Sequence, residues 1–346
     1  MPTKAKPRII GGMFGLEDIS SPKSSLPPFL KGKVILLANA RSGISLLSEL
    51  LSPPNIWMPS YLCGIMLKAL GKRIESVKFY EVGYDLTLPS LNWLDRIQPN
   101  DLVILVDYFG LPCDRNFINR AKEQGAWVLE DACQALLTEG VGRYSDFVLF
   151  SPRKYLGVPD GGILVLNRKI PSGTRKVRQV PVKWWLKTIS ATILRREFDL
   201  GIGSRRWFEL FQETEADGPI GLYAMSGFSR ILLENSFDYP SIAQKRVRNY
   251  RILNEKLMGF ALFPSLPPHV VPLGFPIRVE GRDQVRQALF AEEIYPPVHW
   301  PIKGIVPKKF RNSHRLSDEI MTLPCDQRYG PEDMERIARV FLQSSR

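Results

Sequence analysis

The stretch WVLEDACQALLTEGVGRYSDFVLFSPRKYLGVPDGG, residues 127–162, decides the fold. It contains two short apolar runs, residues 127–130 and 146–150, which we predict to be buried strands. Each run is followed by polar side chains, namely Asp131, Gln134, Ser151, Arg153 and Lys154. In open α/β sheets ligands bind at the carboxyl ends of the strands, so the sequence predicts that chemistry takes place here.

The same alternation of apolar runs and amphipathic segments extends over residues 33–166, a pattern typical of βα units around a mostly parallel sheet. The remaining predicted strands are residues 34–38, 56–58, 77–81, 102–108 and 162–166. The predicted helices are residues 42–51, 64–70, 115–124, 242–257 and 334–342. We therefore predict an α/β fold with an N-terminal arm (1–32), a large domain (33–240) and a small C-terminal α+β domain (241–346).

The composition limits the class of protein. A chain of 346 residues with 44% hydrophobic content can bury two cores, so disorder of the whole chain is excluded. The formal charge of +12 favours anionic partners of several kinds. Four cysteines without paired spacing indicate neither a zinc cluster nor a disulfide framework. No apolar run reaches the ~20 residues that span a bilayer. The N-terminus does not resemble a signal peptide, so a cytoplasmic protein without membrane insertion is expected.

Residues 167–218 are rich in Lys, Arg and Trp. Such a segment can bind a membrane surface or nucleic acid. We favour the alternative that it packs an apolar face on the protein and exposes its charges to solvent.

The polar residues that follow the strands suit pyridoxal 5′-phosphate (PLP), which needs a lysine, an acid against its ring nitrogen and a phosphate cradle. Lys154 would form an imine with the cofactor, and burial beside Arg153 would lower the pKa of this lysine. Asp131 would meet the ring nitrogen and Gln134 the ring hydroxyl. Each residue also has a plainer interpretation: Lys154 as a surface lysine, and Asp131 as a helix N-cap.

A phosphate cradle is predicted after the first strand, where Ser42 and Gly43 open a helix whose dipole favours an anion. Ser42 could equally be a simple N-cap. Ser151 and Arg153 are candidates for completing the cradle.

The order of several motifs resembles the DegT/StrS sugar-aminotransferase family of fold-type I PLP enzymes. The motifs are NARSGI (39–44), MPSYLC (58–63), DYFGLPCD (107–114), EDACQA (130–135), RKYLG (153–157) with DGG (160–162), PVHWP (297–301) and LSDEIMTLP (316–324) with PED (331–333). The resemblance is good over residues 33–166, fair over the last hundred residues and poor between them.

This resemblance implies PLP as cofactor, with Lys154 as the imine lysine and proton shuttle. It also implies a nucleotide-linked keto sugar as acceptor, an amino acid such as glutamate as donor, and a homodimer that shares its active sites. An anionic sugar nucleotide suits a basic protein. The cofactor-binding residues that we predict are Lys154, Asp131, Gln134, Arg41, Ser42, Gly43, Tyr61, Cys63, Ser151 and Ser229. The predicted substrate-binding residues are His299, Arg153 and Arg230.

Three departures from the family pattern affect these assignments. The aromatic residue expected over the cofactor ring is Tyr61 rather than the residue at Cys63. The phosphate serine often found five residues before the lysine is Leu149 here, so Ser151 is proposed instead. The loop that reaches a neighbouring subunit has only a loose counterpart in residues 227–230. Ser229 and Arg230 are assigned this role, although a helix start at residues 225–226 explains them as well.

The sequence therefore favours an aminotransferase that makes an amino sugar for a polysaccharide, glycan or secondary metabolite. One alternative is a PLP-dependent sugar dehydratase or lyase, although that branch lacks the imine lysine. The other is a non-catalytic regulatory protein that uses residues 168–206 to bind a membrane or nucleic acid. Neither nucleic acid nor a membrane is the expected partner of the enzyme.

Overall fold

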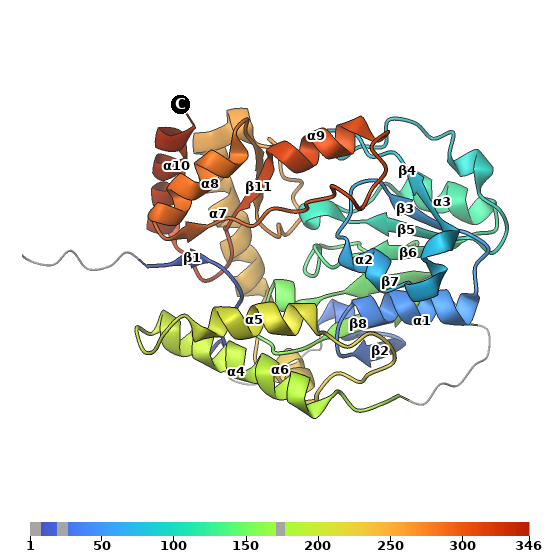
Figure 1. The fold of residues 1–346 in the computed structure, drawn as a ribbon, viewed down its shortest axis with the longest axis horizontal. Helices are drawn as coiled ribbons and strands as arrows, with labels where there is room; N and C mark the ends of the chain where they lie inside the picture. The colour runs from blue at the N-terminus through green and yellow to red at the C-terminus, as the bar shows by residue number, and fades with distance from the viewer. Residues whose placement is uncertain (1–7, 19–26, 171–176, 346) are drawn as a thin grey trace, which may run out of the picture.

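The structure is a computed structural model that describes residues 8–18, 27–170 and 177–345. At its centre lies a seven-stranded sheet in the order β2-β8-β7-β6-β5-β3-β4 (Figure 1). The strands are β2 (Val34–Leu37), β3 (Ile56–Pro59), β4 (Val77–Tyr80), β5 (Leu102–Val106), β6 (Trp127–Asp131), β7 (Phe147–Phe150) and β8 (Gly162–Leu166). Strands β3 to β7 run parallel, and β8 runs antiparallel to β2 and β7. The predicted mostly parallel sheet is confirmed.

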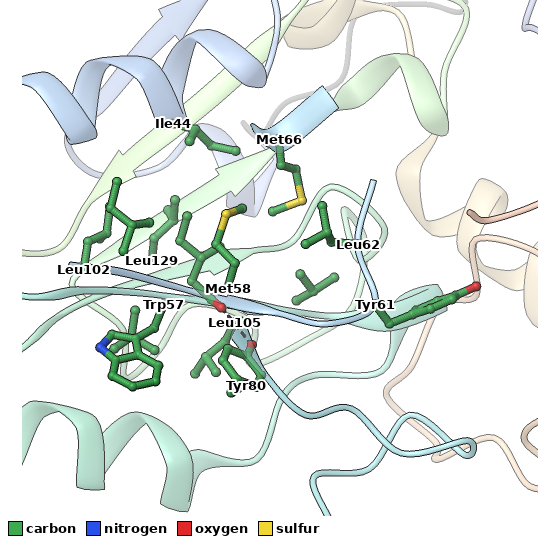
Figure 2. Close-up of a cluster of buried hydrophobic side chains, with 14 of the residues drawn as sticks. Ile44, Trp57, Met58, Tyr61, Leu62, Met66, Tyr80, Leu102, Leu105 and Leu129 are labelled. Atoms are coloured by element: carbon green, nitrogen blue, oxygen red, sulfur yellow. Dashed lines mark hydrogen bonds between the residues drawn. The ribbon is translucent and has the colours of Figure 1, made fainter. Parts of the chain in front are cut away.

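Both faces of the sheet are covered, which explains why its strands are continuous apolar runs. The covering helices include α1 (Arg41–Leu51), α2 (Ile65–Lys68) and α3 (Arg115–Glu123). In Figure 2, Ile44 and Met66 lie on one side of β3, whereas Trp57 and Tyr80 lie on the other. These buried side chains fix the sheet and therefore the positions of the strand ends.

Two predicted elements are shorter by two residues or more in the structure. The strand expected at residues 102–108 ends at Val106, because Phe109 and Gly110 adopt positive φ angles of 56° and 106° and turn the chain. The helix expected at residues 64–70 covers only Ile65–Lys68 before it becomes a 3-10 helix.

The C-terminal part forms a second layer with its own core. Its elements are α7 (Tyr239–Leu257), β9 (Phe275–Arg278), α8 (Arg282–Ala291), β10 (Ile294–Tyr295), α9 (Arg311–Glu319), β11 (Ile320–Leu323) and α10 (Pro331–Ser344). Strands β9 and β11 pair antiparallel, and a cluster that includes Leu253, Phe275 and Ile337 is buried around them. The α+β character expected of this part is therefore present. The domain boundaries at residues 32 and 240 stay predictions.

The N-terminal arm joins this second layer. Its strand β1 (Ile10–Gly11) pairs in parallel with β10 (Ile294–Tyr295), and Ile10 is fully buried in the second core. The backbone N–H of Gly11 also donates to the hydroxyl of Tyr329 at 2.7 Å. Residues 1–7 and 19–26 of the predicted arm lie outside the described residues.

The basic segment forms helices α4 (Val182–Asp199) and α5 (Arg206–Ala216), and α6 (Gly227–Asn235) follows it. Arg195 is buried: it donates to the Gly11 carbonyl at 2.9 Å, pairs with Asp199 and lies over the Trp207 ring. Trp184 and Ala191 are buried, as the predicted packing of this segment on the protein requires, but the charge of Arg195 is buried and not exposed to solvent as predicted. Residues 171–176 of the segment lie outside the described part. Across the described ranges, no helix is long and apolar enough to cross a membrane.

Candidate active site

A cavity opens where the carboxyl ends of β5, β6 and β7 meet the beginning of α1. Its lining includes seven of the predicted site residues: Arg41, Cys63, Asp131, Gln134, Ser151, Arg153 and Lys154. The structure therefore brings the lysine, the acid and the amide into one site, as parallel strands that end at the same edge would. Ser42, Gly43, Tyr61, Ser229, Arg230 and His299 are not among the residues that line the cavity.

Asp131 is the last residue of β6, and alternation along the strand turns its side chain toward the cavity while Glu130 points to the opposite face. One carboxylate oxygen of Asp131 accepts from the backbone N–H of Cys133 at 3.1 Å. The interpretation of Asp131 as a helix N-cap is wrong, because residues 132–146 form turns and contain no helix. The carboxylate is thus held at the carboxyl end of β6, facing the cavity.

Lys154 ends a short 3-10 turn after β7, and its amine lies 6.0 Å from the centroid of the Trp300 ring. The interpretation as a surface lysine is wrong, since this side chain lines the cavity. The turn is held by Arg246 and Gln327, which donate to the carbonyl of Tyr155 at 3.3 Å and 2.7 Å. The lysine is therefore positioned by both the sheet and the C-terminal part.

The expected lowering of the pKa of Lys154 is wrong. Burial does lower this pKa, but neighbouring acids and thiols outweigh it and raise the pKa above the ordinary value of lysine. These neighbours are Cys133, Asp131, Cys63 and Glu215. The guanidinium of Arg153, which was expected to lower this pKa, pairs with Glu215 at 2.7 Å.

Gln134 is fixed as a hydrogen-bond donor toward the site. Its side-chain oxygen accepts from the backbone N–H of Phe109 at 2.8 Å, and its backbone carbonyl accepts from the hydroxyl of Tyr155. The remaining amide nitrogen, Nε2, is buried without a partner among the described residues, although Gln134 lines the cavity. A buried donor without a partner is costly, so the geometry favours a ligand oxygen at this position.

This arrangement leads to a prediction for Gln134→Glu. The new side chain keeps an acceptor for Phe109 N–H but replaces the free donor by an oxygen. We expect the dissociation constant for PLP to rise about tenfold, the worth of one buried hydrogen bond. Equilibrium titration of the cofactor measures this. The melting temperature of the cofactor-free protein serves as the control, and unchanged PLP affinity would contradict the assignment.

The groups that could donate hydrogen bonds to a phosphate differ from those that the sequence predicted. Helix α1 begins at Arg41, and Asn39 takes the capping role because its side-chain oxygen accepts from Ser42 N–H at 3.2 Å. Ser42 Oγ donates to the same oxygen, and Gly43 N–H donates to the Ala40 carbonyl. Ser42 is therefore not the N-cap. The cationic groups at this end of the cavity are Arg41 and Arg153, beside Ser151.

The aromatic wall of the cavity is Trp300, which the sequence analysis did not assign. Its ring is 9% exposed and packs against the fully buried Tyr61, with 5.7 Å between centroids. Tyr61 thus lies behind Trp300, and in Figure 2 it extends away from the aliphatic cluster. Cys63 lines the cavity as predicted. The sequence signal that could have identified Trp300 as a site residue is its place next to a histidine in a proline-flanked loop.

His299 lies just outside the cavity lining, where its Nδ1 is 2.8 Å from the Thr322 hydroxyl. Burial, together with the charge of Lys154, lowers the pKa of His299 to about 3, so its ring is neutral at physiological pH. Its predicted contact with substrate stays a prediction.

Ser229 and Arg230 both lie in α6, and each has a partner within its own chain. Ser229 is fully buried and donates to Asp160, and its backbone N–H is capped by Ser226 Oγ at 3.1 Å. Arg230 pairs with Glu234 at 2.7 Å on the surface. Ser226 thus caps the start of α6, and neither Ser229 nor Arg230 lines the cavity of its own chain. Their predicted role at the phosphate of a neighbouring subunit stays a prediction.

Two carboxyl groups lie behind the site, on the face of the sheet opposite Asp131. Asp107 accepts from Cys113 N–H at 2.8 Å, and Glu130 accepts from Gly142 N–H at 2.9 Å. The second oxygen of each has no hydrogen-bond partner of ordinary geometry among the described residues. Burial and the neighbouring Glu130 raise the pKa of Asp107 well above its usual range, and burial raises the pKa of Glu130 as well. A carboxyl oxygen of each acid and the Cys113 sulfur lie within 4.8 Å of one another. We therefore predict that the two acids share a proton.

The shared proton gives a prediction of pH dependence. A carboxyl whose pKa is raised on folding stabilises the fold below its unfolded pKa of about 4, and this stabilisation is lost as the pH rises through the folded pKa. Asp107→Asn keeps a neutral donor toward Glu130, so the free energy of unfolding should fall less steeply above about pH 4 than in the wild type. Urea unfolding at several pH values measures this. The exposed Asp95→Asn is the control, and parallel pH profiles for wild type and Asp107→Asn would refute the shared proton.

The fold and the site together define a class of protein. The solved structures that resemble this chain include a protein of Streptococcus pneumoniae described as a sugar aminotransferase, in its apo form. Its TM-score is 0.66 at 16% identity, with 91% of this chain and 86% of that chain covered. The S. venezuelae DesV structure, solved with a ketimine intermediate, gives a TM-score of 0.63 at 19% identity over 92% and 86% of the two chains. The predicted fold-type I architecture is thereby confirmed.

The sequence comparisons are more specific. The sequence model of the DegT/DnrJ/EryC1/StrS aminotransferase family matches residues 96–178, which contain Asp131 and Lys154. A curated relative from Acidithiobacillus ferrooxidans, named UDP-N-acetyl-3-dehydro-alpha-D-glucosamine 3-aminotransferase, is 28% identical over 274 residues. The match covers 69% of this chain and spans 63% of the length of the relative. The predicted resemblance to this aminotransferase family is therefore confirmed.

Proposed function

We propose that this protein is a PLP-dependent aminotransferase that transfers an amino group from an amino acid, glutamate in our proposal, to a nucleotide-linked keto sugar. The observation that carries the proposal is the meeting of Lys154, Asp131 and Gln134 on one cavity, where the Gln134 amide nitrogen has no partner among the residues that the structure describes. The donor set fits the cofactor: an amine for covalent attachment, a carboxylate for the ring nitrogen and a fixed N–H for the ring oxygen.

Bound PLP would supply an electron sink for negative charge that develops at the amino-bearing carbon. The side chains of the protein would hold the cofactor, move the proton and restrict the access of water. Lys154 would hold the cofactor and then, once released, move a proton at the reacting carbon, because its amine is at the wall of the same cavity. Asp131 would keep the ring nitrogen protonated. Trp300, with Tyr61 behind it, would limit the movement of the ring and the access of water.

The acceptor is supported by the name of the curated relative, which specifies a UDP-linked 3-keto amino sugar. We propose a sugar nucleotide for this chain on that ground and on its excess of positive charge. A place in polysaccharide, glycan or secondary-metabolite biosynthesis follows from this proposal.

We also propose a homodimer in the cytoplasm. A dimer is supported by apolar side chains that α4 and the turn after it leave exposed, such as Val182, Leu186, Leu200 and Ile202. The cytoplasm is supported by the four cysteines, which are all free.

The proposal is tested in two half-reactions. The purified protein should bind PLP with a visible absorption band, and glutamate alone should convert the bound cofactor to its amino form with release of 2-oxoglutarate. Addition of a UDP-linked 3-keto sugar should then restore the band and yield the amino sugar. Bound PLP that no amino acid converts would contradict an aminotransferase. Steep, salt-dependent binding to DNA or anionic vesicles without PLP uptake would support a regulatory protein instead.

A further inference from the structure

Helix α5 places an acid between the two arginines of the cavity. The Glu215 carboxylate lies 2.7 Å from Arg153 and 3.7 Å from Arg41. Arg41 also donates to the Glu215 backbone carbonyl at 3.3 Å, where the C-terminal end of α5 favours a cation. The segment that follows α5 is attached to the same region, because Asn39, which precedes α1, donates to the Pro219 carbonyl at 2.7 Å. The end of α5 is thus fastened to the beginning of α1.

The two arginines form the part of the cavity that is suited to an anion. Arg41 and Arg153 are 8% and 16% exposed, so neither charge is dissipated in bulk water. The nearby backbone N–H groups of Ser42 and Gly43 already donate to Asn39 and Ala40. The guanidinium groups are therefore the strongest anion-binding donors at this end, and guanidinium binds carboxylate and phosphate oxygens with the same geometry.

Glu215 stands at the mouth of the cavity and not on its floor. Its side chain is 43% exposed although it lines the cavity. Although burial favours the neutral acid, Arg153 and Arg41 hold the pKa of Glu215 below its ordinary value, so the carboxylate is charged at neutral pH. The cavity itself holds about 140 Å³, whereas ligand sites usually measure ~300 Å³ or more. Glu215 and the two arginines therefore line one end of a small cavity.

We infer that Glu215 occupies the position of the cofactor's phosphate between Arg41 and Arg153, and that it must withdraw before a phosphate-bearing ligand binds. The inference rests on the proposed function for the identity of that ligand. Glu215 then sets the affinity of the protein for its cofactor, because each phosphate that enters displaces a paired carboxylate. In the absence of phosphate, the same carboxylate offsets one of the two arginine charges.

The experiment compares wild type, Glu215→Gln and Glu213→Gln as full-length chains freed of cofactor with hydroxylamine. Glu213 is the matched control: it lies two residues earlier on α5, is 50% exposed and pairs with Lys187 at 2.6 Å. Dissociation constants are measured by titration with PLP and with pyridoxal, which lacks the phosphate. Inorganic phosphate is tested separately by the shift that it causes in melting temperature.

Glu215→Gln should bind PLP about tenfold more tightly than wild type, since the phosphate no longer replaces a charge-assisted ion pair. Pyridoxal affinity should not change. Inorganic phosphate should stabilise Glu215→Gln more than wild type, and Glu213→Gln should behave as wild type throughout. Equal or weaker PLP binding by Glu215→Gln would overturn the inference, as would equal stabilisation of all three proteins by phosphate. Failure of wild type to take up PLP, with the phosphate difference intact, would overturn the proposed function and leave this inference standing.

Discussion

Lys154→Ala is expected to yield a colourless protein whose transamination rate falls by at least about 10⁴-fold. The substitution removes both the covalent attachment of the cofactor and the group that moves the proton, and each loss alone is large. The fold should persist, because the side chain projects into a cavity and not into the core. Absorption spectroscopy, steady-state rates and melting temperature measure the three effects.

Lys154→Arg is the companion variant. It keeps a positive charge beside Asp131 and Glu215, so electrostatic effects are preserved, but it cannot form an imine. It should be as inactive as Lys154→Ala. If either variant keeps the visible band and wild-type turnover, Lys154 does not carry the cofactor.

Asp131→Asn should lower the catalytic rate by about 10²–10³-fold, the usual cost of removing one group that stabilises charge in a reaction. The amide cannot keep the ring nitrogen protonated, so the cofactor becomes a poorer electron sink. The cofactor should still attach, because Lys154 is intact. The expected result is therefore a coloured protein with slow conversion by glutamate, measured by stopped-flow absorption.

Glu130→Gln is the matched control for Asp131, since it changes the neighbouring acid on the opposite face of the same strand. It should bind and convert PLP at close to the wild-type rate. A loss of rate in Glu130→Gln as large as that in Asp131→Asn would show that the effect is general to the strand and would refute the role of Asp131.

The parts of the site that the sequence predicted are those that depend on local pattern. A run of apolar residues predicts a buried strand, and the polar residues after it must lie at the edge of the sheet, which places Asp131, Gln134 and Lys154 together. Strand periodicity also accounts for the opposite directions of Glu130 and Asp131. The preference for Lys154 and Asp131 as cofactor-binding residues over their plainer interpretations came in addition from the order of the motifs along the chain.

The parts that the sequence did not predict come from distant segments. Glu215 lies about sixty residues after Lys154, in the segment where the family resemblance is poor, and no local pattern distinguishes it from Glu213. Trp300 enters from the C-terminal part and displaces Tyr61 from the wall of the cavity. The pKa of Lys154 was mispredicted because its direction depends on several side chains that the fold brings around the amine, with Cys133 and Asp131 raising it most and Cys63 and Glu215 less.

The pairing of β1 with β10 affects the order in which parts of the chain can fold during translation. Ile10 leaves the ribosome long before Ile294, its partner, so the second core cannot close during most of translation. The central sheet has all of its strands by Leu166, although Trp300, Phe310 and Leu316 join its core later. Synthesis should therefore yield a sheet that is assembled early and an amino-terminal strand that waits for the last fifth of the polypeptide. A fusion partner placed before Ile10 would therefore interfere with the pairing of β1 and β10 and not with the assembly of the central sheet.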